Sequence, residues 1–153
     1  MPQAVKRRRF TLEEYHRMGE AGILADDPRI ELLAGAVVVR EPTGSRHAGT
    51  VDRIAHLFFS RLAGRAIVRV QNPVAFPDEM SELQPDVTLL RLKTDFWAGL
   101  GEAWLVDLTT ERVEVFRRLT GGHYRDVARL ARGAGLTPLA FPDLALVVDD
   151  LLG

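Results

Sequence analysis

The sequence predicts an α/β fold in which a mixed, twisted β-sheet is covered by two helices. Residues 11–19 and 45–62 carry apolar side chains at helical spacing. Short valine-rich segments between and after these stretches are typical of strands. With 153 residues, the chain is expected to form one domain, residues 10–153, preceded by a basic tail, residues 1–9.

The first elements are marked by cap and turn residues. Thr11-Leu12-Glu13-Glu14 is a capping-box pattern that predicts the start of a helix. Ala34-Gly35 interrupts the strand-like residues 29–40, which predicts a hairpin. Ser45 is expected to cap the second helix, and Gly64 to end it.

The rest of the chain is rich in predicted strands. Gly121-Gly122 separates two strand-like segments and predicts a hairpin. The apolar segment 103–108 is expected to be buried on both faces. Residues 136–152 predict an extended segment followed by a short terminal turn. The expected strands are 66–76, 86–90, 103–108, 113–119 and 123–130, with a loop at 78–82.

Composition excludes several kinds of site. The chain has no cysteine, which excludes disulfides, thiolate metal sites and a cysteine nucleophile, and suits a cytoplasmic location. No stretch approaches the roughly 18 apolar residues of a membrane span, so no membrane partner is expected. The formal net charge of −1 leaves DNA as a partner, because metal-binding acids can offset basic surface elsewhere. The basic run Lys6–Arg9 is interpreted as a solvated tail, with weak contact to DNA phosphates as the alternative.

Three carboxylates lie in or beside apolar strands, at Glu31, Asp86 and Asp107. Such an acid is costly to desolvate unless it meets a metal or a cation. Asp86 follows a proline and begins an apolar strand, so its carboxylate should be held in a defined place, as Mg²⁺-dependent phosphodiester cleavage requires. Each acid also has a structural interpretation: a turn residue at Asp86, an edge-strand charge at Glu31, and a turn cap at Asp107, which is favoured there. The four histidines have no ligand spacing and are interpreted as surface or helix-face residues.

Six phrases of the sequence resemble, in order, phrases of one protein family. No single phrase is specific, but six in order are, and they cover nearly the whole chain. They resemble the Uma-two family of restriction-endonuclease-like proteins, within the PD-(D/E)xK superfamily. The phrases are TLEEY at 11–15, RIELLAG at 29–35, QPDV at 84–87, EAWLVD at 102–107, VEVF at 113–116 and FPDL at 141–144.

The resemblance implies a restriction-endonuclease-like fold and Mg²⁺-dependent cleavage of DNA, with Glu31 and Asp86 as metal-site acids. It also implies that Asp86 is followed by a strand bearing a glutamate and a helix bearing an aspartate and a lysine. Neither phrase occurs here, and the 17 residues between Asp86 and Trp104 are too few to hold both elements. The fold is therefore expected to be internally shortened.

The chain has only two lysines, Lys6 in the tail and Lys93. Lys93 lies seven residues beyond Asp86 and is the one candidate for a catalytic lysine. In Glu102-Ala103-Trp104, the nearest match to a Glu-x-Lys pattern, tryptophan stands at the lysine position. We therefore expect weak Mg²⁺ binding and weak or lost cleavage. The alternatives are a non-catalytic DNA- or protein-binding module and a truncated, inactive gene product.

A shortened fold would also affect the sheet. The strands at 86–90 and 103–108 would have either unpaired edges or a direct parallel pairing, for which residues 91–102 barely suffice as a crossover. Unpaired apolar edges favour association with another chain. We therefore expect either a marginal monomer or a homo-oligomer that covers the gap.

Overall fold

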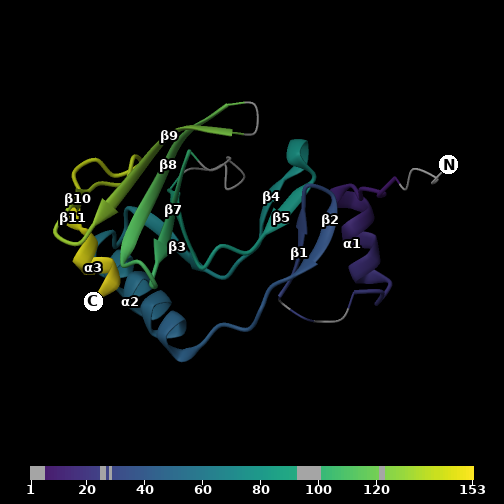
Figure 1. Ribbon diagram of the computed structural model, residues 1–153, viewed down its shortest axis with the longest axis horizontal. Coiled ribbons are helices and arrows are strands. Elements are labelled where there is room, and N and C mark those ends of the chain that lie inside the picture. Colours follow the sequence, from purple (N-terminus) through teal and green to yellow (C-terminus); the bar gives the residue numbers. More distant parts are fainter. Residues whose placement is uncertain (1–5, 25–26, 28, 93–100, 121–122) are drawn as a thin grey trace. The chain divides into compact units, whose positions relative to one another are not determined.

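The computed structural model describes residues 6–24, 27, 29–92, 101–120 and 123–153. The chain forms two compact units. Figure 1 labels their helices and strands and colours them along the sequence. The N-terminal unit comprises residues 1–42 and 71–85, and the C-terminal unit comprises residues 43–70 and 86–153. The chain therefore passes from one unit to the other three times. That the whole forms a single restriction-endonuclease-like domain stays a prediction.

The N-terminal unit contains helix α1 (Leu12–Glu20) and a four-stranded antiparallel sheet in the order β2-β1-β5-β4. The predicted capping box is confirmed, because the Thr11 hydroxyl accepts from the Glu14 N–H and the Glu14 carboxylate accepts from the Thr11 N–H. The second of these bonds, together with Arg8, lowers the pKa of Glu14. The strands are β1 (Ile30–Leu33), β2 (Ala36–Val39), β4 (Val74–Phe76) and β5 (Ser81–Leu83), with a 3₁₀ turn, η1, at Pro77–Glu79.

The hairpin between β1 and β2 confirms the turn predicted at Ala34-Gly35. Both residues have positive φ, 47° and 77°, as a tight two-residue hairpin turn requires. The Gly35 N–H donates to the Met80 carbonyl, and its own carbonyl accepts from the Phe10 N–H. The turn therefore ties the start of the chain and the residue before β5 to the sheet.

Gly35→Ala is expected to destabilise the N-terminal unit more than its φ alone explains. A Cβ at this position would lie 2.7 Å from the Cβ of Arg9, closer than such atoms approach. Gly64 has a similar φ of 71° with nothing within 4 Å, so Gly64→Ala isolates the backbone cost, about 1 kcal/mol. Urea denaturation of both variants measures the difference. Equal losses would show that Arg9 moves aside freely.

Two sequence expectations are wrong between residues 66 and 83. Residues 66–76 do not form one strand: β3 (Ala66–Val70) and β4 belong to different sheets and different units. Gln71 adopts a φ of 50°, which breaks the extended chain and which a glutamine does not announce in a sequence. The loop expected at 78–82 instead contains the end of η1 and the start of β5.

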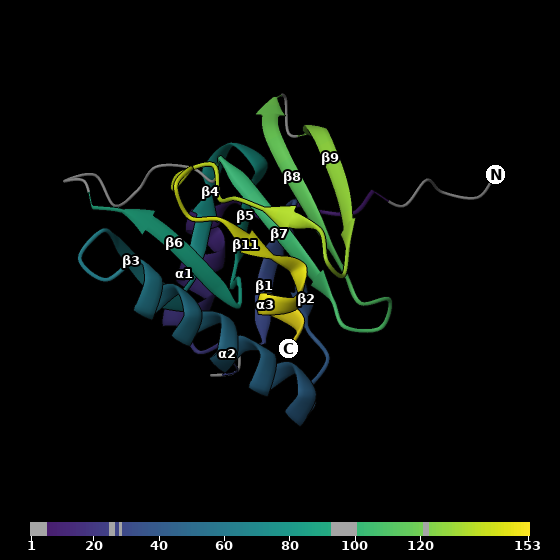
Figure 2. The same ribbon diagram turned by 90° about the vertical axis from the view of Figure 1, so that its left-hand side faces the viewer.

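The C-terminal unit contains helix α2 (Ser45–Arg61) and helix α3 (Val148–Leu152), which contact each other (Figure 2). The N-cap of α2 is Gly44, one residue before the expected cap, and it makes no side-chain cap bond. The predicted hairpin around 121–122 is confirmed by the pairing of β8 with β9, although those two glycines lie outside the described residues. The strands are β3, β6 (Val87–Arg91), β7 (Glu102–Asp107), β8 (Arg112–Thr120), β9 (His123–Ala131), β10 (Gly135–Leu136) and β11 (Leu146–Val147).

The core of the C-terminal unit joins both helices to the strands. Side chains of α2, β8 and α3 meet there, and Trp104 of β7 packs against Phe58 of α2. The expectation that residues 103–108 are buried on both faces is wrong, because Leu105 is 54% exposed. Only alternate residues of β7 face the core, since one side of this sheet is open to solvent. The buried cluster is Ile54, Phe58, Leu62, Val113, Val115, Leu136, Phe141, Leu144, Leu146, Val148, Leu151 and Leu152.

The strands on either side of residues 92–101 pair with different neighbours. β6 pairs with β3 and β7 pairs with β8, both antiparallel. Within the described part of the chain there is thus no ladder between β6 and β7, and the direct parallel pairing considered from the sequence is not found. The α/β class is confirmed, with strands divided among several antiparallel sheets. Self-association stays a prediction. Of the helices described, none is long and apolar enough to cross a membrane.

Candidate functional site

Asp86 lies immediately before β6 in the C-terminal unit, where Pro85 leads the chain into the strand. Its Oδ1 is 3.0 Å from Nε2 of His47, which belongs to the first turn of α2. The two side chains are 39% and 30% exposed, so both reach solvent. The structure thus places a carboxylate and an imidazole together at a partly exposed position.

Sequence reasoning missed His47. The four histidines of the chain show no metal-ligand spacing, and 39 residues separate His47 from Asp86. The two meet because α2 packs against β3 and β6, the pair of strands that Asp86 precedes. Nothing in the local sequence indicates this packing, so only the tertiary structure could identify the pair.

Glu31 lies on β1 in the N-terminal unit and is 8% exposed. Its Oε1 accepts a hydrogen bond from the Gln84 N–H at 2.8 Å. Arg40 Nε lies 3.0 Å from the same oxygen, although its N–H is not aligned for a hydrogen bond. The Arg40 charge therefore compensates the buried carboxylate. These contacts support Glu31 as an anchor for the backbone that leads into Asp86.

Two further acids of the C-terminal unit have structural partners. Asp107 accepts from the Thr110 hydroxyl and from the N–H groups of Thr109 and Thr110. The Thr110 hydroxyl is the main cause that lowers the pKa of Asp107, followed by the two backbone bonds. Asp107 therefore caps the turn after β7, as favoured from the sequence.

Glu102 connects β7 to the C-terminal segment. Its Oε1 accepts from the indole N–H of Trp104 at 2.6 Å and from Arg117 Nε at 2.9 Å, and its Oε2 accepts from the Leu139 N–H at 2.5 Å. Both oxygens are thus occupied by protein donors, which makes Glu102 a poor candidate for a missing metal ligand.

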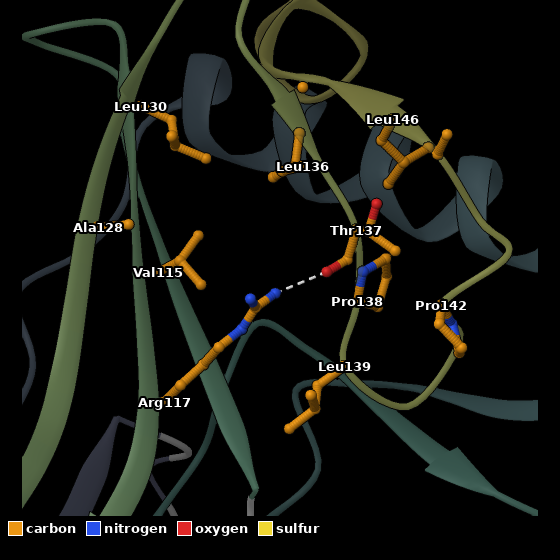
Figure 3. Close-up of a pocket in the computed structure, with 12 residues that line it drawn as sticks. Val115, Arg117, Ala128, Leu130, Leu136, Thr137, Pro138, Leu139, Pro142 and Leu146 are labelled. Carbon is orange, nitrogen blue, oxygen red and sulfur yellow. Dashed lines mark hydrogen bonds between the residues drawn. The ribbon is translucent and has the colours of Figure 1, made fainter.

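A shallow, mostly apolar pocket lies beside this contact, between β8 and β9 and the segment after β10 (Figure 3). Arg117 reaches across it and donates from Nη2 to the Thr137 carbonyl at 2.7 Å. Neither Asp86 nor His47 lines the pocket, and Arg117, its charged lining residue, is engaged by the Thr137 carbonyl and by Glu102. We therefore interpret it as a gap in the packing of the C-terminal segment.

The remaining candidate positions contribute little to an assembled site. Lys93 lies outside the described residues. In the basic tail, Arg8 pairs with Glu14 at 2.5 Å and lies over the ring of Phe10, which directs it back onto the N-terminal unit. This supports the interpretation of that residue as part of the protein surface rather than as a DNA contact.

The described side chains do not fit the Mg²⁺ site that the resemblance implies. Mg²⁺ demands near-octahedral oxygen coordination and gives up water reluctantly. Among the described residues there is no group of three histidine or acidic side chains that could hold an ion. Asp86 and Glu31 belong to different units, and each already contacts a basic side chain of its own unit.

Comparison with known proteins identifies relatives of both sequence and fold. A crystal structure described as a "putative nuclease belonging to DUF820" from Anabaena variabilis ATCC 29413 is similar, with a TM-score of 0.72 and 15% sequence identity. The similarity covers 94% of this chain and 97% of that chain. At this identity it establishes the fold alone. No curated protein matches the chain.

The sequence relationship is more direct. The family Uma2, described as "Putative restriction endonuclease", matches residues 12–98. This range contains α1, the β1–β2 hairpin, α2 and Asp86. Uma2 is the same family that the six sequence phrases resemble. Because the match covers more than half of the chain, this chain belongs to the Uma2 family.

Proposed function

We propose that this chain is a DNA-directed, nuclease-like domain in which hydrolysis is weak or lost. Family membership supports the nuclease origin. The observation that carries the loss is the state of the two acids: Glu31 is compensated by Arg40, and Asp86 is paired with His47. Among the described residues, neither belongs to a group of three histidine or acidic side chains that could hold an ion.

Phosphodiester hydrolysis needs an activated water and stabilisation of the charge that develops on the phosphate. In metal-dependent nucleases the ion supplies both when several oxygen ligands hold it. Here Asp86 can orient a water molecule or serve as one ligand of an ion, and His47 can hold the Asp86 carboxylate in place. These residues bind and orient, but among the described side chains no third histidine or acid joins them to hold the ion that would supply positive charge to the phosphate.

Incubation with supercoiled plasmid and Mg²⁺ tests this proposal. We expect no nicking above a mock preparation, and no difference between the wild-type chain and Asp86→Ala. Robust Mg²⁺-dependent nicking that Asp86→Ala abolishes would overturn the loss of catalysis. If Lys93→Ala abolished it too, Lys93 would be the base or the phosphate contact.

Binding is measured separately, by fluorescence anisotropy of a labelled DNA duplex. A DNA-directed domain is expected to bind the duplex with an affinity that falls as salt increases, because phosphate contacts release counterions. Binding without cleavage supports the proposal. Absence of both would leave a protein-binding module or an inactive gene product, and would contradict the assignment to DNA.

A further inference from the structure

His47 and Asp86 have the geometry of two neighbouring metal ligands. Two ligand atoms at about 2.1 Å from one ion, at the right angle of a square-planar or octahedral site, are about 3.0 Å apart, whereas the wider angle of a tetrahedral site would separate them by about 3.4 Å. The separation of His47 Nε2 and Asp86 Oδ1 is 3.0 Å. An ion could therefore take the place of the proton that the two atoms share, with little movement of either side chain.

The donor atoms decide which ions suit this position. Imidazole nitrogen suits Zn²⁺, Cu²⁺ and Ni²⁺, whereas Mg²⁺ prefers oxygen ligands alone. The neutral imidazole would bind through the lone pair of Nε2 and keep its proton on Nδ1. Both side chains are partly exposed, so water can occupy the remaining coordination positions.

Regular elements hold the backbone at both residues. His47 lies in the first turn of a 17-residue helix, and Asp86 precedes a strand in which Thr88 is buried. The neighbouring cation Arg46 is directed to Glu111, at 3.6 Å. A helix and a strand that pack together thus hold the two ligands, which reduces the entropy lost when an ion binds.

We propose that His47 and Asp86 form a binding site for a first-row transition ion that accepts ligands at a right angle, such as Ni²⁺ or Cu²⁺, in preference to Mg²⁺. The proposal rests on the proposed function only in taking Asp86 as the metal acid. It explains why an acid that the family resemblance assigns to Mg²⁺ has a nitrogen donor as its neighbour.

A second histidine–carboxylate pair provides the main rival. His16 Nε2 lies 2.8 Å from Glu82 Oε2 in the N-terminal unit. The Glu82 side chain is less exposed than that of Asp86, 18% against 39%, but the His16 side chain is more exposed than that of His47, 50% against 30%. Exposure therefore does not separate the two pairs, and the His16→Ala variant has to. The exposed His56, on the same helix as His47, has no carboxylate partner among the described residues and serves as a matched control.

Isothermal titration calorimetry of the full chain without a histidine tag tests the site, with NiCl₂ and MgCl₂ as separate titrants. We expect one Ni²⁺ per chain, bound at least about tenfold more tightly than Mg²⁺. His47→Ala and Asp86→Asn should each weaken Ni²⁺ binding at least about tenfold, while His56→Ala leaves it unchanged. Circular dichroism confirms folding, and His47→Asn replaces His47→Ala if the latter does not fold.

Three results would overturn the proposal. The first is equal affinity for Ni²⁺ and Mg²⁺, and the second is Ni²⁺ binding that survives in both His47 variants. The third is Ni²⁺ binding that is lost in His16→Ala but retained in His47→Ala, which would place the ion at the His16–Glu82 pair. The absorption spectrum of the Co²⁺-loaded chain gives a second readout, because it should change in His47→Ala but not in His56→Ala. None of these measurements involves DNA, so their failure and the failure of the nicking or DNA-binding tests are distinguishable.

Discussion

Leu151→Ala is expected to lower the free energy of unfolding by about 2–5 kcal/mol. Leu151 lies in α3, is fully buried, and belongs to the cluster that joins α2, β8 and α3. Truncation removes the transfer free energy of the lost carbons and leaves a cavity that rigid neighbours fill only partly. Since a domain's whole stability is about 5–15 kcal/mol, a large part of the margin would be lost.

Urea denaturation followed by far-ultraviolet circular dichroism measures this effect. Leu105→Ala is the matched control, because Leu105 is exposed on the outer face of β7 and its truncation should change the stability little. A loss in Leu151→Ala as small as that in Leu105→Ala would contradict the placement of α3 in the core.

Glu31→Ala is expected to destabilise the chain by about 3 kcal/mol, the low end of the range for a broken buried ion pair, because Arg40 is about a third exposed. The substitution leaves the Arg40 charge without its partner and the Gln84 N–H without its acceptor. Glu31→Gln keeps an acceptor oxygen for that N–H and should lose less. The same denaturation experiment compares the two variants.

This comparison separates two roles of Glu31. If Glu31 is a structural anchor, Glu31→Ala should lose stability clearly. Glu31→Gln should lose less, because it keeps an acceptor for the Gln84 N–H. A metal ligand predicts little loss, or even a gain, because removing an uncompensated carboxylate from a metal-free site relieves its desolvation. If Glu31→Ala were as stable as the wild-type chain, the anchor role would be wrong and the role implied by the resemblance would gain support.

Local chemistry made several elements predictable. The capping box at Thr11 and Glu14 acts within a single turn of helix, and Ala34-Gly35 supplies the positive φ of a tight hairpin. Both signals are complete within four residues, so no tertiary information is needed to interpret them. By contrast, the break at Gln71 could not be predicted, because a valine-rich stretch around a glutamine looks like one continuous strand.

The candidate site was predictable only in part. Asp86 was recognisable because it follows a proline and precedes an apolar strand. Glu31 was recognisable because it is a charged residue within an aliphatic strand. Their partners were not, because Arg40 reaches Glu31 across a hairpin and His47 reaches Asp86 from a helix 39 residues away. A single carboxylate can serve as anchor, turn cap or ligand, and its neighbours decide which.

The sequence by itself determined the fold class, the family, and the elements whose ends carry local signals, such as α1 and the β1–β2 hairpin. It could do so because caps, turns and apolar periodicity act over a few residues and do not depend on what the element packs against. Only the tertiary structure decided how the strands divide among antiparallel sheets and which groups Asp86 and Glu31 contact. Those outcomes depend on which surfaces meet across long separations in sequence, where burial and charge compensation outweigh local preference.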